Sequence, residues 1–177
     1  MLNTPSKRHS SKLAYSFFGA AASCALSLGA SSAMAQSSAN DTFNVTATVV
    51  DACLITANDL SFGNYNSLSG ADLDASSTLD VTCSNGTSYD IELDAGTTTG
   101  GAISARLMTD GSNTLGYNLY TTTGRTTVWG DGTGASQTIS GTGSGSSQSL
   151  NVYGRITAGQ TVPIGSYSDA VKATINF

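Results

Sequence analysis

Apolar and polar residues alternate along short stretches of this chain. No window of a dozen residues after position 35 shows the 3.6-residue period of an amphipathic helix. Turn pairs such as Asn85-Gly86 and Asp110-Gly111 separate the stretches. Runs with a period of two residues lie at 43–49, 78–83, 89–93, 116–120, 150–156 and 171–177. The pattern predicts an all-β fold, a sandwich or a barrel of short strands.

Residues 132–149 interrupt this pattern, because they are almost entirely Gly, Ser and Thr apart from Ile139. Such a composition is typical of a mobile loop or of a linker between domains. The part that follows, residues 150–177, holds only about two strands and is too short to bury a core of its own. We therefore expect a mobile loop or a loosely paired hairpin within one domain, and keep the linker as the alternative.

The two ends of the pattern have a special relation. Residues 171–177 stop on an apolar position, so we expect the last strand to leave an open sheet edge. Residues 43–49 alternate in the same way, and a free strand of this kind is able to add to the edge of a neighbouring molecule. The alternative is that residues 43–49 form the first strand of their own domain.

Residues 1–35 have the features of a secretory signal peptide. Lys7, Arg8 and Lys12 precede an apolar, small-residue stretch at 13–28, and Ala33-Met34-Ala35 is a small-x-small cleavage site. A membrane anchor is the alternative, although the stretch is short and rich in Ser, Gly and Ala. A lipoprotein with Cys24 is a second alternative, but Ala21 stands where a larger aliphatic residue is expected.

Removal of the signal leaves a strongly acidic protein. All twelve acidic residues follow position 35, and the bases that remain are Arg106, Arg125, Arg155 and Lys172. Such a surface repels nucleic acid, so we expect no nucleic-acid partner. It also keeps a protein with open sheet edges soluble.

Two cysteines remain after the signal, Cys53 and Cys83. In an exported protein they most simply form a disulfide. Two free thiols or a metal site are the alternatives, and the metal site lacks a histidine partner after position 35.

Candidate chemistry is sparse. The single histidine, His9, lies in the signal, which excludes a Ser-His-Asp site in the mature chain. Asp90, Glu92 and Asp94 share one face of a predicted strand, and we interpret them as solvated because Ile91 and Leu93 would then face the core. Trp129 is expected to pack at the rim of a sheet, with stacking on a sugar as the alternative. We predict no catalytic residue, no cofactor and no metal site.

The residues after position 43 resemble the spore coat protein U domain family, the pilin subunits of Csu-type archaic chaperone–usher pili in Gram-negative bacteria. No single matching segment is diagnostic, but their order and spacing over most of the chain are specific. The segments are Phe43-Asn44-Val45-Thr46-Ala47-Thr48-Val49, Leu60-Ser61-Phe62-Gly63-Asn64-Tyr65, Val81-Thr82-Cys83-Ser84-Asn85-Gly86, Leu115-Gly116-Tyr117-Asn118-Leu119-Tyr120, Val128-Trp129-Gly130-Asp131-Gly132, Gly154-Arg155-Ile156 and Gly165-Ser166-Tyr167-Ser168-Asp169, before the terminal Phe177.

The resemblance implies an incomplete immunoglobulin-like (Greek-key) sandwich that lacks its last strand and is completed by donor-strand exchange. It divides the chain into a signal peptide (1–35), an N-terminal donor-strand segment (36–50) and a pilin domain (51–177). Cys53 and Cys83 match the disulfide of the family. The donor row is Phe43, Val45, Ala47 and Val49, and the edge of the acceptor groove is Val171, Ala173, Ile175 and Phe177.

The resemblance also implies partners and a function. A periplasmic pilus chaperone would lend a strand first, and at an outer-membrane usher the donor segment of another copy, or of a related pilin, would replace it. We expect an exported structural subunit of surface fibres for adhesion and biofilm formation, with no catalysis. The family's tip subunits carry a further domain ahead of the pilin part, so a shaft or adaptor position is expected. The alternative is a self-complete secreted β-sandwich that acts as a surface- or glycan-binding adhesin module.

Overall fold

The computed structural model describes residues 36–177, so the predicted signal peptide, with His9 and Cys24, lies outside the described residues. Residues 36–52 form no strand and are exposed. The rest of the described chain is built from eight strands and contains no helix. The strands are β1 (Cys53–Ala57), β2 (Leu73–Cys83), β3 (Ser88–Leu93), β4 (Arg106–Thr109), β5 (Thr114–Tyr120), β6 (Ile139–Thr142), β7 (Gln148–Ile156) and β8 (Ala173–Asn176).

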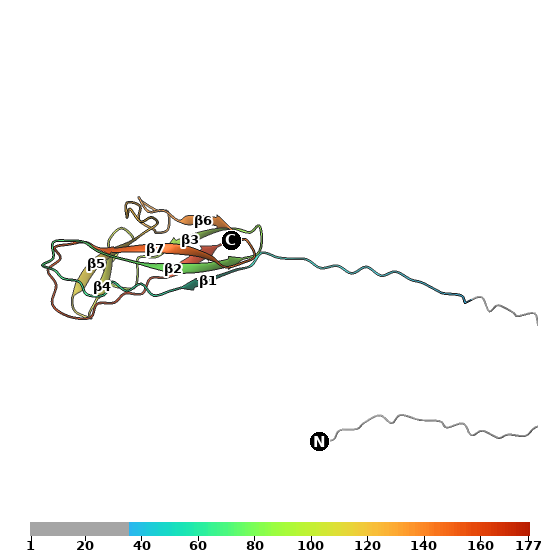
Figure 1. Ribbon diagram of the computed structural model, residues 1–177, viewed down its shortest axis with the longest axis horizontal. Helices are drawn as coiled ribbons and strands as arrows, with labels where there is room; N and C mark the ends of the chain where they lie inside the picture. The colour runs from blue at the N-terminus through green and yellow to red at the C-terminus, as the bar shows by residue number, and fades with distance from the viewer. Residues whose placement is uncertain (1–35) are drawn as a thin grey trace, which may run out of the picture. The chain divides into compact units, whose positions relative to one another are not determined.

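The strands form two sheets in which every pairing is antiparallel (Figure 1). One sheet has the order β1-β2-β7-β5-β4, and the other has the order β6-β3-β8. Strands β2 and β7 run side by side over nine paired positions, from Leu73 opposite Ile156 to Val81 opposite Gln148. The predicted all-β class is confirmed.

The core lies between the two sheets and follows from the period of two. On β3 the apolar residues Ile91 and Leu93 are 0% and 3% exposed, while Asp90, which lies between the buried Tyr89 and Ile91, is exposed. Asp90 and Glu92 are therefore on the outer face of β3, as predicted, whereas Asp94 follows the strand, is half-buried and accepts hydrogen bonds from the main-chain N–H groups of Gly96 and Lys172. The remaining buried apolar side chains are Leu79, Val81, Cys83, Tyr89, Leu115, Tyr117, Leu119, Trp129, Val152 and Ile156.

Five of the six predicted runs correspond to β2, β3, β5, β7 and β8, and the run at 43–49 lies in no strand; β1, β4 and β6 were not predicted. Strand β6 lies inside the Gly, Ser and Thr stretch at 132–149 and pairs with β3 from Ser88 opposite Thr142 to Ile91 opposite Ile139. This pairing makes the stretch part of the sheet, so it is not a linker between domains. It is not a hairpin either, because β6 and β7 lie in different sheets.

The two cysteines form a disulfide, which confirms the predicted pair and rules out free thiols and a metal site there. Cys53 and Cys83 lie directly opposite each other on β1 and β2. The bridge fixes the first residue of β1 to the last residue of β2, so this end of the sheet is closed covalently.

Trp129 is fully buried, and its indole Nε1 donates a hydrogen bond to the main-chain oxygen of Ile91 at 2.9 Å. The packing interpretation is therefore correct, and the alternative of a sugar-stacking residue is wrong. A buried indole N–H needs an acceptor, and here the acceptor belongs to the opposite sheet layer.

Arg106 is also fully buried, which its charge did not predict. Its guanidinium donates five hydrogen bonds to neutral acceptors between 2.7 and 3.2 Å. Burial lowers the pKa of Arg106 from its usual value, but an arginine remains charged in a protein. Because the acceptors belong to both sheets, this side chain joins the two layers. They are the main-chain oxygens of Leu93, Asp94, Ile103 and Trp129 and the side-chain oxygen of Asn118.

Candidate functional site: an open groove between the sheets

A large cavity opens between the two sheets on the side where β1 and β8 form the sheet edges. Its volume is about 1120 Å³. We call it the groove. Residues 57–67, which continue from β1, are its first wall, and residues 162–173, which lead into β8, are its second wall.

The floor of the groove consists of core side chains. Leu93 and Leu115 are 3% and 4% exposed, yet both line the cavity. The groove therefore reaches into the hydrophobic core rather than resting on the surface of a sheet. The other floor residues are Leu79, Met108, Tyr117, Leu119, Val152 and Ile156.

The first wall is held by side chains rather than by a strand ladder. Phe62 stands over Gly154 of β7, where an added Cβ atom would lie 2.7 Å from the phenyl ring, so only glycine allows this close approach. Phe62 also packs edge-on against Tyr117, with ring centroids 6.1 Å apart. Further along, the Tyr65 hydroxyl accepts a hydrogen bond from the Gln160 main-chain N–H at 2.9 Å and donates to the Thr157 main-chain oxygen at 3.2 Å.

The second wall is held by two carboxylates and by an isolated antiparallel bridge, in which the main-chain N–H groups of Ser168 and of Thr109 on β4 each donate to the other's oxygen at 3.0 and 2.9 Å. Asp169 accepts hydrogen bonds from the main-chain N–H groups of Thr97 and Thr98 at 2.9 and 3.0 Å. Asp94 accepts from the main-chain N–H of Lys172 at 2.9 Å. Both contacts anchor the wall to the loop after β3. Gly96 in that loop has φ +84°, and a Cβ atom there would overlap the Asp169 carboxylate.

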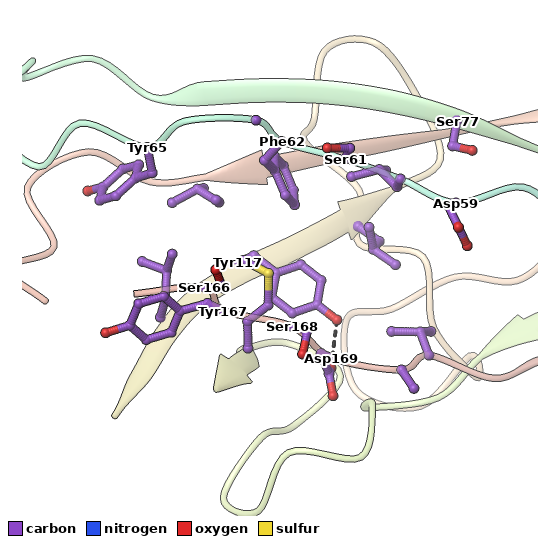
Figure 2. A pocket seen from close by; sticks show the side chains of 18 of the residues that line it. Asp59, Ser61, Phe62, Tyr65, Ser77, Tyr117, Ser166, Tyr167, Ser168 and Asp169 are labelled. Atoms are coloured by element: carbon purple, nitrogen blue, oxygen red, sulfur yellow. Dashed lines mark hydrogen bonds between the residues drawn. The ribbon is translucent and has the colours of Figure 1, made fainter. Parts of the chain in front are cut away.

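Figure 2 shows how the walls face each other. Phe62 and Tyr65 lie along one side, and Tyr167 and Asp169 lie along the other, with β5 crossing behind them. The Tyr117 hydroxyl on β5 donates a hydrogen bond to Asp169 at 2.7 Å and so ties the floor to the second wall.

This hydrogen bond shifts both titrations. Burial raises the pKa of the Tyr117 hydroxyl, and its bond to Asp169 raises it further. Burial also acts to raise the pKa of Asp169, but the hydrogen bonds from Tyr117, Thr98 and Thr97 outweigh it and hold that pKa below its usual value. The carboxylate is thus ionised at neutral pH, and its charge is turned toward donors of the protein itself.

The strand edges beside the groove lack partners in the described residues. Strand β8 pairs with β3 on one side only, and β1 pairs with β2 on one side only. An unpaired edge beside an apolar slot has the two features that β-augmentation needs, which are free main-chain donors and acceptors and pockets for alternate side chains.

The predicted acceptor residues are only partly in this cavity. Val171 and Ala173 line the groove. Ile175 packs against the core, and Phe177 is 59% exposed at the chain end; neither lines the cavity. Their assignment to an acceptor edge stays a prediction.

The groove extends instead toward residues 162–169 and along the whole first wall, which the reasoning on the terminal strand missed. A signal was present in the sequence, because Leu60, Phe62 and Tyr65 are apolar residues among polar ones with no strand-length run of their own. Such a segment belongs to a wall rather than to a sheet.

The predicted donor row is exposed in the single chain. Phe43, Val45 and Val49 are 87%, 82% and 91% exposed, and Ala47 is exposed as well. Residues 43–49 lie in no strand, so they are not the first strand of their own domain. Their role as a donor stays a prediction.

Other kinds of site find no support between residues 36 and 177. That part of the chain holds no group of three or more His, Cys, Asp or Glu side chains arranged to bind a metal. It also has no helix of the length and apolarity needed to cross a membrane.

The model of the Spore Coat Protein U domain matches residues 39–174, which include the groove and both of its walls. The chain belongs to the Spore Coat Protein U domain family. This membership confirms the resemblance found in the sequence. Protein U of Myxococcus xanthus is 35% identical over 175 residues, a match that covers 89% of this chain and 96% of the relative.

This Spore Coat Protein U domain is also similar to a solved structure. The crystal structure of the CsuC–CsuE chaperone–tip adhesion subunit pre-assembly complex from archaic chaperone–usher Csu pili of Acinetobacter baumannii is similar, with a TM-score of 0.55 and 26% identity. The match covers 73% of this chain, and the chain spans 40% of the length of that one. Together with the two antiparallel sheets, this likeness confirms the incomplete immunoglobulin-like sandwich.

Proposed function

We propose that this chain is an exported structural subunit of an archaic chaperone–usher pilus, and that it polymerises by donor-strand complementation. The observation that carries the proposal is a groove of about 1120 Å³ that reaches the core beside the unpaired edge of β8. A groove of this kind leaves the sandwich one strand short, and an inserted strand completes it.

The N-terminal segment of another copy is the strand that fits. Its row of Phe43, Val45, Ala47 and Val49 is exposed and unpaired. Burial of the Phe and the two Val side chains contributes about 1.5–3 kcal/mol each, an upper-bound total of about 5–9 kcal/mol. Ladder hydrogen bonds to the free edge of β8 add to this.

The same groove requires other partners before assembly. An apolar slot beside an open strand edge is prone to aggregation, so it needs a strand from elsewhere until the donor arrives. We assign that role to a periplasmic pilus chaperone, and strand exchange to an outer-membrane usher. The chaperone is supported by the likeness to a pilus subunit in complex with its chaperone. Copies of this chain, or related pilins, then supply the donor.

The product is a fibre on the surface of a Gram-negative bacterium, which serves adhesion and biofilm formation. The chain contributes structure rather than catalysis. A self-complete adhesin module is the rival, but an unfilled groove and an unpaired segment 43–49 do not favour it.

The test is deletion of residues 36–50 in cells that express the subunit with its chaperone and usher. We expect chaperone-bound monomers but no fibres, measured by electron microscopy and by pull-down with the chaperone. A matched control replaces the polar row Asn44, Thr46 and Thr48 with Ser, which keeps the apolar row and should leave fibres intact. Normal fibres from the deletion variant would refute the assignment of the donor.

A further inference from the structure

The N-terminal segment is fixed to its own domain just before β1. The main-chain N–H of Ser84 donates to the oxygen of Ala52 at 2.9 Å, which continues the β1–β2 ladder by one step. The Thr87 hydroxyl donates to the Asp51 carboxylate at 2.8 Å. Because Thr87 is only 6% exposed, this bond ties the N-terminal segment to a buried position of the domain. We call these two contacts, with the adjacent disulfide to Cys83, the clamp.

The clamp makes the link between consecutive subunits very short. The donor row ends at Val49 and the clamp begins at Asp51, so Val50 is the whole connection. Consecutive Cα atoms are about 3.8 Å apart, which keeps the last donor residue within about 8 Å of the clamp. Two domains joined this closely must touch each other, so the surfaces that meet become part of the fibre.

The clamp lies at one end of the sandwich. Cys83 ends β2 there, and Leu73 begins β2 at the other end, opposite Ile156 of β7. An 11-residue strand is about 33 Å long. The loops that precede β2 and follow β7 therefore lie about one strand length from the clamp, at the end of the sandwich away from the C-terminus in Figure 1.

Those two loops carry exposed apolar residues, Leu68 in the first and Pro163 and Ile164 in the second, which we call the tips. Leu68 is 92% exposed and Ile164 is 103% exposed, and Pro163 beside it is exposed as well. Ser67 and Ile164 line the same groove, so the tips stand at its mouth. At the clamp end, Val50 and Leu54 are 72% and 73% exposed. Each end thus presents large apolar side chains that its own fold leaves uncovered.

The direction of the inserted strand decides which ends meet. The second wall runs from the tips toward the clamp end, since residues 162–171 lead into β8. A donor antiparallel to it runs toward the tips and places Val49 there, and antiparallel pairing is the more stable arrangement. The next domain then begins at the tips.

We propose, on the basis of the function proposed above, that consecutive copies of this chain share a second contact besides the donor strand. In it, Leu68, Pro163 and Ile164 of one copy cover Val50 and Leu54 of the next. One molecule is unable to make this contact with itself, because its own tips and clamp lie at opposite ends of β2. A head-to-tail contact of this kind repeats without closing, which gives a stiff filament instead of a string of loosely tethered domains.

The experiment compares fibres of the full chain assembled with chaperone and usher. Leu68→Asp and Leu54→Asp should each leave fibre formation intact, because neither residue lies in the donor row or lines the groove, but the persistence length in electron micrographs should fall severalfold. The double variant Leu68→Asp with Leu54→Lys restores an attraction across the joint and should recover most of the stiffness. Asn151→Asp, which adds a charge on the exposed face of β7, is the control and should leave stiffness unchanged.

A second measurement does not depend on stiffness. A photo-crosslinking residue at position 68 should join neighbouring subunits, and mass spectrometry should place the adduct on residues 50–54 of the other copy. Wild-type stiffness in both single variants, or adducts confined to other surfaces, would overturn the second contact. Absence of fibres from the wild-type chain would refute the proposed function instead, so the two failures are distinguishable.

Discussion

Two regions of this sandwich are held together by different means: the closed side, where the central strands β2 and β3 are paired on both edges, and the groove side. Where β2 lies between β1 and β7, and β3 lies between β6 and β8, main-chain ladders run on both sides of a central strand. Val81 and Ile91 on these central strands are fully buried. On the groove side the walls carry no strand between Ala57 and Leu73, or between Ile156 and Ala173, and the core is open to a cavity.

The groove side compensates with polar side chains. The side-chain amide of Gln160 accepts a hydrogen bond from the Gly116 main-chain N–H at 2.7 Å and donates one to the Gly116 main-chain oxygen at 2.8 Å. It thus bonds to Gly116 as a neighbouring strand would. Tyr65 and Asp169 fix the rest of the two walls. This difference indicates that the walls of the groove are already ordered before a donor strand binds. A donor strand finds its walls in place, so less ordering opposes insertion.

The most severe way to break the closed side is to remove the guanidinium that joins the sheets. Arg106→Met should lower the free energy of unfolding by about 5 kcal/mol. Five acceptors, three of them in buried hydrogen bonds, lose this donor at about 1–3 kcal/mol for each buried one, and relief from burying the charge offsets part of this loss. Urea unfolding followed by the fluorescence of Trp129 measures the change. A loss below about 1 kcal/mol would show that Arg106 does not join the layers.

The second test opens the clamp end of the closed side. Cys83→Ser removes the bridge to Cys53, and we expect a loss of roughly 3.5 kcal/mol together with a lower yield of subunit. The double variant Cys53→Ser with Cys83→Ser separates the bridge from the effect of a lone thiol. Unchanged yield and melting temperature in both variants would remove the proposed role of the disulfide.

A smaller effect is expected when the floor is released from the second wall. Tyr117→Phe removes the hydrogen bond to Asp169 and keeps the ring, so stability should fall by about 1 kcal/mol. Tyr153→Phe on β7 is the matched control. A binding assay with a peptide of residues 36–50 sharpens the test, because a pre-shaped wall predicts weaker binding to Tyr117→Phe and unchanged binding to the control.

The smallest expected effect is on the pH dependence of stability, to which Asp169 of the second wall contributes. The folded-state pKa of Asp169 lies below its unfolded value, so its stabilisation is complete above about pH 4 and is lost as the pH falls through the folded pKa. Asp169→Asn should therefore flatten the acid limb of stability against pH. Main-chain hydrogen bonds from Asn113 and Ser112 lower the pKa of Asp110 to about 2, so Asp110→Asn is a comparison variant outside the groove. Parallel acid limbs for wild type and Asp169→Asn would contradict the role of this carboxylate.

Sequence alone predicted the parts of the fold that alternate cleanly. Ile91 and Leu93 faced the core as expected because a two-residue period and a central strand agree. The walls were missed since their contacts are single side-chain bonds, such as Tyr65 with Gln160, or one isolated main-chain bridge, Ser168 with Thr109, between distant residues. Arg106 was missed for a related reason, because no local pattern marks a cation whose acceptors come from four separate segments.

The sequence predicted an apolar site at a sheet edge, but it did not predict most of the residues that line the groove. Val171 and Ala173 of the predicted terminal strand line the cavity, where one precedes and the other begins β8, and their role as an acceptor edge stays a prediction. The terminal strand did not indicate that the cavity turns away from Phe177 toward Tyr167. The course of residues 162–171 depends on the bonds of Asp169 to the loop after β3, of Lys172 to Asp94 in that loop, and of Ser168 to Thr109.

The most direct test of the central claim is a cryo-electron-microscopy structure of fibres assembled from this chain. The account predicts that residues 43–49 of one subunit lie as a strand beside β8 of another, with Phe43, Val45 and Val49 in the groove. Fibres in which each groove is filled by a segment of its own chain, or remains empty, would contradict it.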